Sequence, residues 1–217
     1  MSYFIRPMEM GDIHQVSGIE REAFSPPWPA TNFKRELASN SLTYYFVACE
    51  EAPESKQTPP ENVNAGCNTS SRSRLEALRH GLRRLFGVKK PSETPCQFVL
   101  GFAGLWFMAD EAHLANIAVR ESHRNQGIGE RLFISAVELA IERKARFITL
   151  EVRASNKAAQ ALYGKYGLVE VGTRRAYYMD NKEDAVIMTA EAVTSPAYLY
   201  SFQKQKQAHV QRWGLKA

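Results

Sequence analysis

Apolar and polar positions in the first half of the chain follow strand and helix periods in turn. Residues 3–6 predict a strand, and apolar residues between positions 10 and 23 recur at helical spacing. Thr31 is typical of a helix N-cap and predicts a second helix that reaches residue 38. Further runs rich in β-branched and aromatic residues predict an antiparallel meander over residues 43–48, 98–107 and 113–119.

The second half of the chain alternates helices with strands. A long helix is expected from Gly129 to about residue 144, then a strand over 146–152 and a short helix over 156–166 that Gly167 closes. A strand-rich first half followed by this βαβαβ order predicts one α/β domain. The chain has 217 residues, of which 44% are hydrophobic, and this is enough for one core.

The junction between the strand at 117–119 and the long helix is suited to binding a phosphate. N–H groups at a helix N-terminus have no intrahelical partner and carry partial positive charge, so a diphosphate can satisfy several of them. A side chain at Gly127 or Gly129 would keep the phosphate away from the backbone. A P-loop is excluded because no Lys follows Gly129, and a dinucleotide fingerprint is excluded because Leu132 replaces its third small residue. An ordinary strand-to-helix turn remains an equal alternative.

The pattern Arg124-x-x-Gly127-x-Gly129 resembles the coenzyme A pyrophosphate loop of the GCN5-related N-acetyltransferase (GNAT) superfamily. Further segments resemble its RimI-like subfamily, namely residues 150–156, 161–163, 174–178 and 183–188, together with Trp28 and Phe33 in the N-terminal part. The resemblance covers about residues 3–50 and 97–190. It implies a mixed central sheet of about six to seven strands flanked by four helices.

The resemblance implies an enzyme that transfers the acetyl group of acetyl-CoA to the α-amine of a protein N-terminus. The RimI-like subfamily acetylates the N-terminal alanine of a small-subunit ribosomal protein, so protein N-termini are the expected partners. No metal is expected.

The resemblance also assigns the cofactor-binding residues, which are Ile117, Ala118, Val119, Arg124, Asn125, Gln126, Gly127, Ile128, Gly129, Glu130 and Asn156. Two of these positions point to a weaker site than is typical of the family. The position of Asn125 is often basic in relatives, and Glu130 places an acid near the phosphates. Asn156 has a second interpretation, because an asparagine before a helix is also a common N-cap.

Two residues match the family's catalytic positions. Glu151 matches the general base, acting through a water, and Tyr163 matches the tyrosine that protonates the departing sulfur. From the residues alone, a Glu at a strand end before Arg153 is usually part of a surface ion pair, and Tyr163 could be a core aromatic. Tyr163 lies seven residues after Asn156, two helical turns along the same face, so both can point at one cofactor.

The family places four aromatic residues beside the acceptor, namely Trp28, Phe33, Tyr177 and Tyr178. An N-terminal acceptor also requires only a modest base. An α-amine with a pKa of about 7.8 is roughly one third neutral at pH 7.5, whereas a lysine amine with a pKa of about 10.4 is about 0.1% neutral.

An insertion at residues 50–97 interrupts the predicted domain, which spans residues 1–190. Its first part is polar and proline-rich and is expected to be disordered, and residues 71–87 predict a basic amphipathic helix. Residues 71–90 carry seven Lys or Arg and one Glu, so this segment accounts for the whole net charge of +5. The helix is expected to cover the enzyme's own sheet, or to contact RNA, an acidic partner or an anionic membrane surface. The C-terminal tail, residues 191–217, indicates no function.

Three cysteines without a Cys-x-x-Cys pair indicate neither a zinc site nor a disulfide framework. The N-terminus lacks the order of a signal peptide, and the longest apolar run is too short for a membrane helix, so a cytoplasmic protein is expected. Two other classes of function stay open: an N-acetyltransferase for lysine or small amines, and a non-catalytic module that binds coenzyme A or docks on RNA. The sequence does not indicate the oligomeric state.

Overall fold

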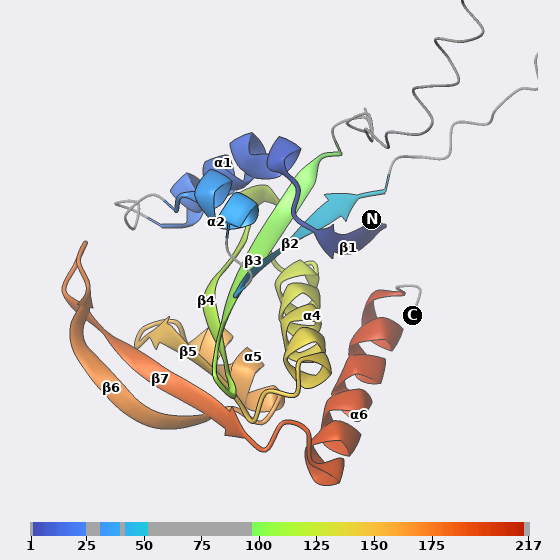
Figure 1. Cartoon of the computed structure of the whole chain (residues 1–217), viewed down its shortest axis with the longest axis vertical. Helices are drawn as coiled ribbons and strands as arrows, with labels where there is room; N and C mark the ends of the chain where they lie inside the picture. The colour runs from blue at the N-terminus through green and yellow to red at the C-terminus, as the bar shows by residue number, and fades with distance from the viewer. Residues whose placement is uncertain (1, 25–30, 40–41, 52–96, 215–217) are drawn as a thin grey trace, which may run out of the picture. The chain divides into compact units, whose positions relative to one another are not determined.

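One seven-stranded sheet forms the centre of the protein, with the strand order β1-β2-β3-β4-β5-β7-β6 (Figure 1). The computed structural model describes residues 2–24, 31–39, 42–51 and 97–214. The strands are β1 (Tyr3–Pro7), β2 (Thr43–Glu50), β3 (Val99–Met108), β4 (Glu111–Val119), β5 (Phe147–Arg153), β6 (Val169–Tyr178) and β7 (Glu183–Glu191). All neighbouring strands are antiparallel except β4 and β5, which are parallel. The predicted α/β fold with a mixed sheet is confirmed.

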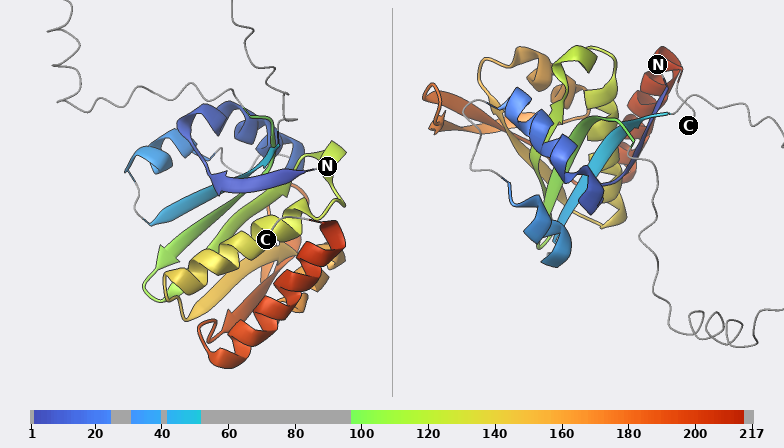
Figure 2. Two further views of the ribbon diagram at one scale, coloured as in Figure 1. Left: turned by 90° about the vertical axis from the view of Figure 1, so that its right-hand side faces the viewer. Right: turned by 90° about the horizontal axis from the view of Figure 1, so that it is seen from above.

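The helices cover both faces of this sheet. They are α1 (Ile13–Ala23), α2 (Phe33–Ser39), α4 (Ile128–Glu142), α5 (Lys157–Lys165) and α6 (Pro196–Trp213), with short 3-10 turns η1 (Met10–Asp12) and η2 (Glu121–His123). Helices α1 and α2 contact one face, whereas α4 packs on the other face with α6 beside it (Figures 1 and 2). The predicted linkers and basic helix between residues 52 and 96 lie outside the described residues, as does Trp28.

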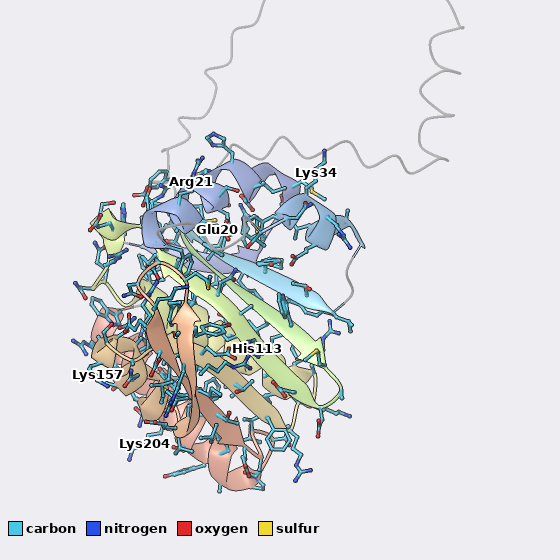
Figure 3. The ribbon with its side chains drawn as sticks, turned by 90° about the vertical axis from the view of Figure 1, so that its left-hand side faces the viewer. Glu20, Arg21, Lys34, His113, Lys157 and Lys204 are labelled. Atoms are coloured by element: carbon cyan, nitrogen blue, oxygen red, sulfur yellow. The ribbon has the colours of Figure 1, made fainter. Side chains whose placement is uncertain are left out.

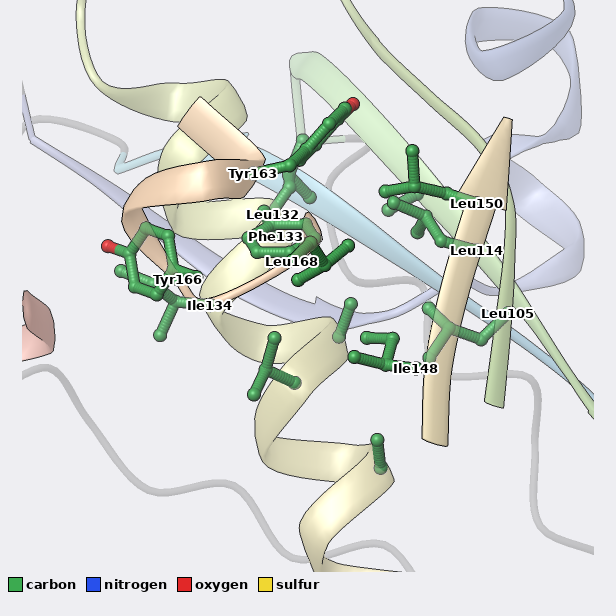
Figure 4. Packing of buried hydrophobic residues seen from close by; sticks show 14 of the residues in the cluster. Leu105, Leu114, Leu132, Phe133, Ile134, Ile148, Leu150, Tyr163, Tyr166 and Leu168 are labelled. Atoms are coloured by element: carbon green, nitrogen blue, oxygen red, sulfur yellow. The ribbon is translucent and has the colours of Figure 1, made fainter. Parts of the chain in front are cut away.

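A separate hydrophobic cluster lies on each face. On the face of α4, residues such as Leu132, Phe133 and Leu150 are at most 1% exposed and form the larger cluster (Figure 4). On the face of α1, Ile19 and Phe102 belong to the smaller cluster. Side chains alternate between the faces along a strand, so β2, β3 and β4 contribute buried residues to both clusters.

Strands β4 and β5 pair only at one end. Their register joins residues 111–114 to residues 147–150, although β4 continues to Val119 and β5 to Arg153. The register of β4 with β3 shifts between Leu114 and Asn116, which leaves Ala115 as a bulged residue. A bulge bends the strand that carries it. The second halves of the two strands therefore do not pair with each other, and the candidate residues of β4 and β5 lie in these halves.

The C-terminal tail contains a helix that the sequence analysis did not assign. Ser195 caps α6 by accepting a hydrogen bond from the Tyr198 N–H at 3.3 Å, Pro196 occupies its first turn, and Gly214 ends it with a φ of 62°. Only Phe202 and His209 are buried among its 18 residues, so its apolar pattern is sparse. At α2, the side chain of Asn32 accepts a hydrogen bond from the Arg35 N–H, and the predicted cap Thr31 bonds to Glu20 instead.

Candidate active site

The turn before α4 exposes backbone N–H groups in a conformation suited to an anion. Asn125 and Gly127 have φ values of 60° and 79°, in the left-handed region that Asn and Gly tolerate best. Gly127 is the N-cap of α4, and no side chain caps the helix there. The N–H groups of Ile128, Gly129 and Glu130 occupy the first turn, where an α-helix provides no backbone partner. Arg124 and Asn125 are exposed beside this turn.

The two glycines of this turn meet different requirements. A side-chain carbon built on Gly127 would fall 2.5 Å from Nε1 of Trp213, so packing inside the protein already excludes a side chain there. At Gly129 the nearest atom would be Cγ2 of Val119 at 3.6 Å, an ordinary van der Waals contact. The protein therefore has room for alanine at 129, and a glycine there leaves space for a ligand above the helix N-terminus.

The Glu130 carboxylate is paired with neighbours on α6 and at the end of α5, and the expectation that it weakens phosphate binding stays a prediction. Oε1 of Glu130 accepts hydrogen bonds from Lys165 Nζ at 2.5 Å and from Tyr166 Oη at 2.7 Å, and Oε2 lies 3.3 Å from Nδ1 of His209. Burial alone would raise the pKa of Glu130, but these contacts outweigh burial and lower the pKa to about 2. A role in binding phosphate is left to its backbone N–H.

Glu151 lies on β5, just past the last residue that pairs with β4. Its side chain is 8% exposed, with Oε2 3.0 Å from Nε2 of His113 and Oε1 2.9 Å from a guanidinium nitrogen of Arg174. These partners are not those of a surface ion pair, the alternative interpretation of Glu151, and the nearby Arg153 binds Asp180 and Glu183. The hydrogen bond with His113 outweighs burial and lowers the pKa of Glu151.

His113 is a functional candidate that the sequence analysis missed. It lies on β4 in register with Thr149 of β5, and its ring contacts Glu151 two residues further along β5, on the sheet face seen in Figure 3. Its pKa is raised, first by the hydrogen bond to Glu151, although burial acts in the opposite direction. The ring stacks on Trp106 at a centroid distance of 6.2 Å. The only sequence signal was a histidine within the strand predicted over residues 113–119.

Tyr163 lies on the other face of the sheet. It is 6% exposed, and its ring centroid lies 5.0 Å from that of Phe133 in the larger cluster, while its hydroxyl points away from that cluster (Figure 4). Burial raises the pKa of Tyr163, so the hydroxyl keeps its proton near neutral pH. The ring is therefore a core aromatic and the hydroxyl remains a candidate proton donor.

The two catalytic candidates thus lie on opposite faces of the sheet. Leu150 and Val152, the neighbours of Glu151, point into the larger cluster, so Glu151 points to the α1 face. Ile117, Ala118 and Val119 lie on β4 along the gap between β4 and β5, in the part of β4 that does not pair with β5. Asn156 caps α5 by accepting a hydrogen bond from the Ala159 N–H at 3.1 Å, so its role as an N-cap is established by geometry.

The predicted acceptor residues separate into two groups. Tyr177 and Tyr178 lie on β6 with their rings 5.3 Å apart, and the Arg153 guanidinium lies 3.9 Å from the centre of the Tyr178 ring. Phe33 does not line a groove. It is 1% exposed and packs edge-on against Tyr45 and Phe102. The prediction for Phe33 is wrong because the first turn of α2 faces the smaller core cluster.

Comparison with known proteins identifies the family. The profile of the acetyltransferase (GNAT) family matches residues 58–168. A Bacillus subtilis protein named a putative ribosomal protein bS18-alanine N-acetyltransferase is 34% identical over 184 residues, which cover 85% of this chain and 92% of that protein. The chain belongs to the GNAT family.

Two further relatives agree with this assignment. A ribosomal protein bS18-alanine N-acetyltransferase of Escherichia coli is 44% identical over 89 residues, which cover 40% of this chain and 60% of that protein. The crystal structure of the Escherichia coli ribosomal-protein-S18-alanine N-acetyltransferase superposes with a TM-score of 0.59 at 26% identity, covering 88% of this chain and 94% of that one. This GNAT protein is therefore an N-acetyltransferase.

GNAT enzymes use acetyl-CoA, and the residues described here fit that donor. The uncapped first turn of α4 suits a pyrophosphate, and the gap between β4 and β5 leaves backbone groups of β4 without a partner on β5. Within the described residues, no group of His, Cys, Asp and Glu is arranged to hold a metal ion, and no helix is both long enough and apolar enough to span a membrane.

Proposed function

We propose that this protein transfers the acetyl group of acetyl-CoA to the α-amine of a protein N-terminus, with the N-terminal alanine of a small-subunit ribosomal protein as its acceptor. The observation that carries the proposal is the Bacillus subtilis relative, because it is similar over 92% of its length and its name specifies alanine on ribosomal protein bS18. A ribosomal acceptor places the reaction in the cytoplasm.

The proposed proton acceptor is the pair formed by Glu151 and His113. An N-terminal ammonium with a pKa of about 7.8 must lose one proton before its nitrogen can form the new C–N bond. Glu151 accepts that proton, directly or through a water, and passes it across the 3.0 Å contact to a neutral His113, which restores the carboxylate and leaves an imidazolium. Because the pKa of His113 is raised and that of Glu151 is lowered, the imidazole is the more basic member of the pair.

Tyr163 is the proposed proton donor on the opposite face of the sheet. When the C–S bond of the thioester breaks, the sulfur takes the bonding electrons and needs a proton. The Tyr163 hydroxyl is held protonated by burial and supplies it, and the phenolate regains a proton from solvent. The backbone N–H groups of Ile117 to Val119 would align the thioester, and those of Ile128 to Glu130 would hold the pyrophosphate, with Arg124, Asn125 and Gln126 beside them.

Tyr177 and Tyr178 are proposed to wall the acceptor groove. Both lie on the strand that supplies Arg174 to Glu151, so a peptide beside them would present its amine to the base. Trp28, outside the described residues, remains a candidate for the same groove, and the basic segment at 71–90 remains a candidate for contact with ribosomal RNA.

The test measures release of coenzyme A with two peptides. One peptide carries a free N-terminal alanine, and the other is blocked at its N-terminus and contains an internal lysine. Release with the first peptide alone, lost in Glu151→Gln and retained in Glu191→Gln, supports the proposal. Glu191 is an exposed glutamate and the last residue of β7. It pairs with Phe147 of β5, whereas Glu151 pairs with Ile187. Release with the blocked peptide would assign lysine instead, and no release with either would assign a small amine or a binding role.

A further inference from the structure

The end of helix α6 lies against the turn that precedes α4. A side-chain carbon built on Gly127 would fall 2.5, 2.6 and 2.8 Å from three atoms of the Trp213 indole, so the ring covers Gly127 directly. Gly127 has a left-handed φ of 79°, which glycine tolerates best, and because it has no Cβ the ring can approach its backbone this closely. Trp213 therefore touches the N-cap residue of the proposed phosphate-binding turn.

A second contact lies one helical turn earlier on α6. His209 is 1% exposed, and its Nδ1 lies 3.3 Å from Oε2 of Glu130. Glu130 is the third residue of α4, and the same carboxylate accepts hydrogen bonds from Lys165 of α5 and from Tyr166, the C-cap of α5. One carboxylate at the start of α4 thus joins three helices.

Other contacts hold α6 in place along its length. The ring of Phe202 stacks on Tyr198 and lies 6.1 Å from the ring of Tyr166, and Lys206 forms an ion pair with Glu138 of α4 at 2.5 Å. Because α6 is anchored to both α4 and α5, Trp213 and His209 reach the turn from a fixed support. A turn held in its binding conformation loses less conformational entropy when a ligand binds.

We propose that α6 positions the pyrophosphate-binding turn of this enzyme, with Trp213 fixing Gly127 and His209 fixing Glu130. The inference rests on the proposed use of acetyl-CoA, and it adds helix α6 to the elements that support the coenzyme A site. Trp213 and His209 are positioning residues, since they act through the turn. The C-terminal helix therefore determines affinity for the nucleotide end of the donor and leaves acceptor binding unaffected.

The experiment compares full-length variants by calorimetric titration with coenzyme A. Trp213→Ala is expected to raise the dissociation constant about tenfold, which corresponds to about 1.4 kcal/mol and is similar to the cost of ordering one backbone residue. Trp213→Phe keeps a flat ring over Gly127 and is expected to bind within about twofold of the natural chain. Tyr200→Ala is the matched control, because Tyr200 is an aromatic residue of the same helix with 78% exposure.

Steady-state kinetics separates positioning from general destabilisation. Trp213→Ala is expected to raise KM for acetyl-CoA about tenfold while KM for the peptide and kcat stay within about twofold. An unchanged dissociation constant in a folded Trp213→Ala protein would overturn the inference and leave the proposed function intact, whereas failure of the natural chain to bind coenzyme A would overturn the proposed function. If Trp213→Ala does not fold, Trp213→Leu, which keeps an apolar side chain without a flat ring, decides the question by the same measurement.

Discussion

Replacing Glu151 with glutamine removes one negative charge from the centre of the site and keeps the size of the side chain. The carboxylate is 8% exposed and lies between His113 at 3.0 Å and Arg174 at 2.9 Å. Arg174 is 54% exposed, so solvent screens its contribution and its loss as a partner matters little. The change therefore acts mainly through the proton-accepting pair of Glu151 and His113.

The expected loss is in kcat rather than in KM. A positioned general base contributes roughly 10²- to 10⁴-fold to rate, which corresponds to about 3–5.5 kcal/mol of barrier. Glutamine cannot accept the proton, and the effect appears in the transition state and not in ground-state binding, so KM for the peptide should change little. Coenzyme A release with the alanine peptide measures this, with Glu191→Gln as the control.

The same variant has an independent signature in the titration of His113. Glu151 raises the pKa of His113, and burial lowers it. Without the carboxylate, the pKa of His113 should fall toward or below the ordinary histidine value of 6.5. NMR titration of the ring, assigned with His113→Gln, measures the shift. In the natural enzyme the raised pKa stabilises the fold below pH 6.5, and this contribution is lost as the pH rises through the raised value.

Two results together would refute this reasoning. If Glu151→Gln kept kcat within about twofold of the natural enzyme, the carboxylate would not take part in proton transfer. If the pKa of His113 did not fall, the two residues would not form a coupled pair in solution. A low kcat with an unchanged pKa of His113 would instead retain Glu151 as a base and remove His113 from the mechanism.

Three other predictions concern the donor side of the site. Gly129→Ala should fold with an unchanged melting temperature, since its Cβ has 3.6 Å of room, but should weaken coenzyme A binding about tenfold in calorimetry, whereas Gly127→Ala should also lower the melting temperature because of the 2.5 Å clash. Tyr163→Phe should lower kcat about 10²-fold without unfolding, measured by coenzyme A release, and an unchanged kcat would make Tyr163 a core residue only. Glu130→Gln should abolish a stabilisation that is complete above pH 4.5 and is lost as the pH falls toward about 2, measured by acid unfolding; an unchanged acid transition would contradict the lowered pKa.

The sequence predicted those parts of the fold that depend on local periodicity. The start of α4 and the cap of α5 were placed within one residue, because glycine and asparagine at helix ends leave a local signal. Helix α6 was missed although Ser195, Pro196 and Gly214 mark its ends, because only two of its residues are buried and its apolar stripe is sparse. The capping residues at the two ends of the segment were not enough to predict a helix, because the residues between them are mostly polar.

The candidate site shows a stricter limit, because side-chain partners across a sheet depend on register. Nothing near Glu151 in the sequence indicates His113, 38 residues earlier; the two meet because β4 and β5 are parallel neighbours that pair up to Leu114 and Leu150. The same argument applies to the surroundings of Glu130. An acidic residue beside a phosphate-binding loop is expected to repel the phosphate. The Glu130 carboxylate, however, contacts Lys165, Tyr166 and His209 of the same protein. The sequence therefore shows which residues are charged but not what each charged side chain contacts. The fold decides whether a charged side chain faces a ligand or pairs with other residues of the protein.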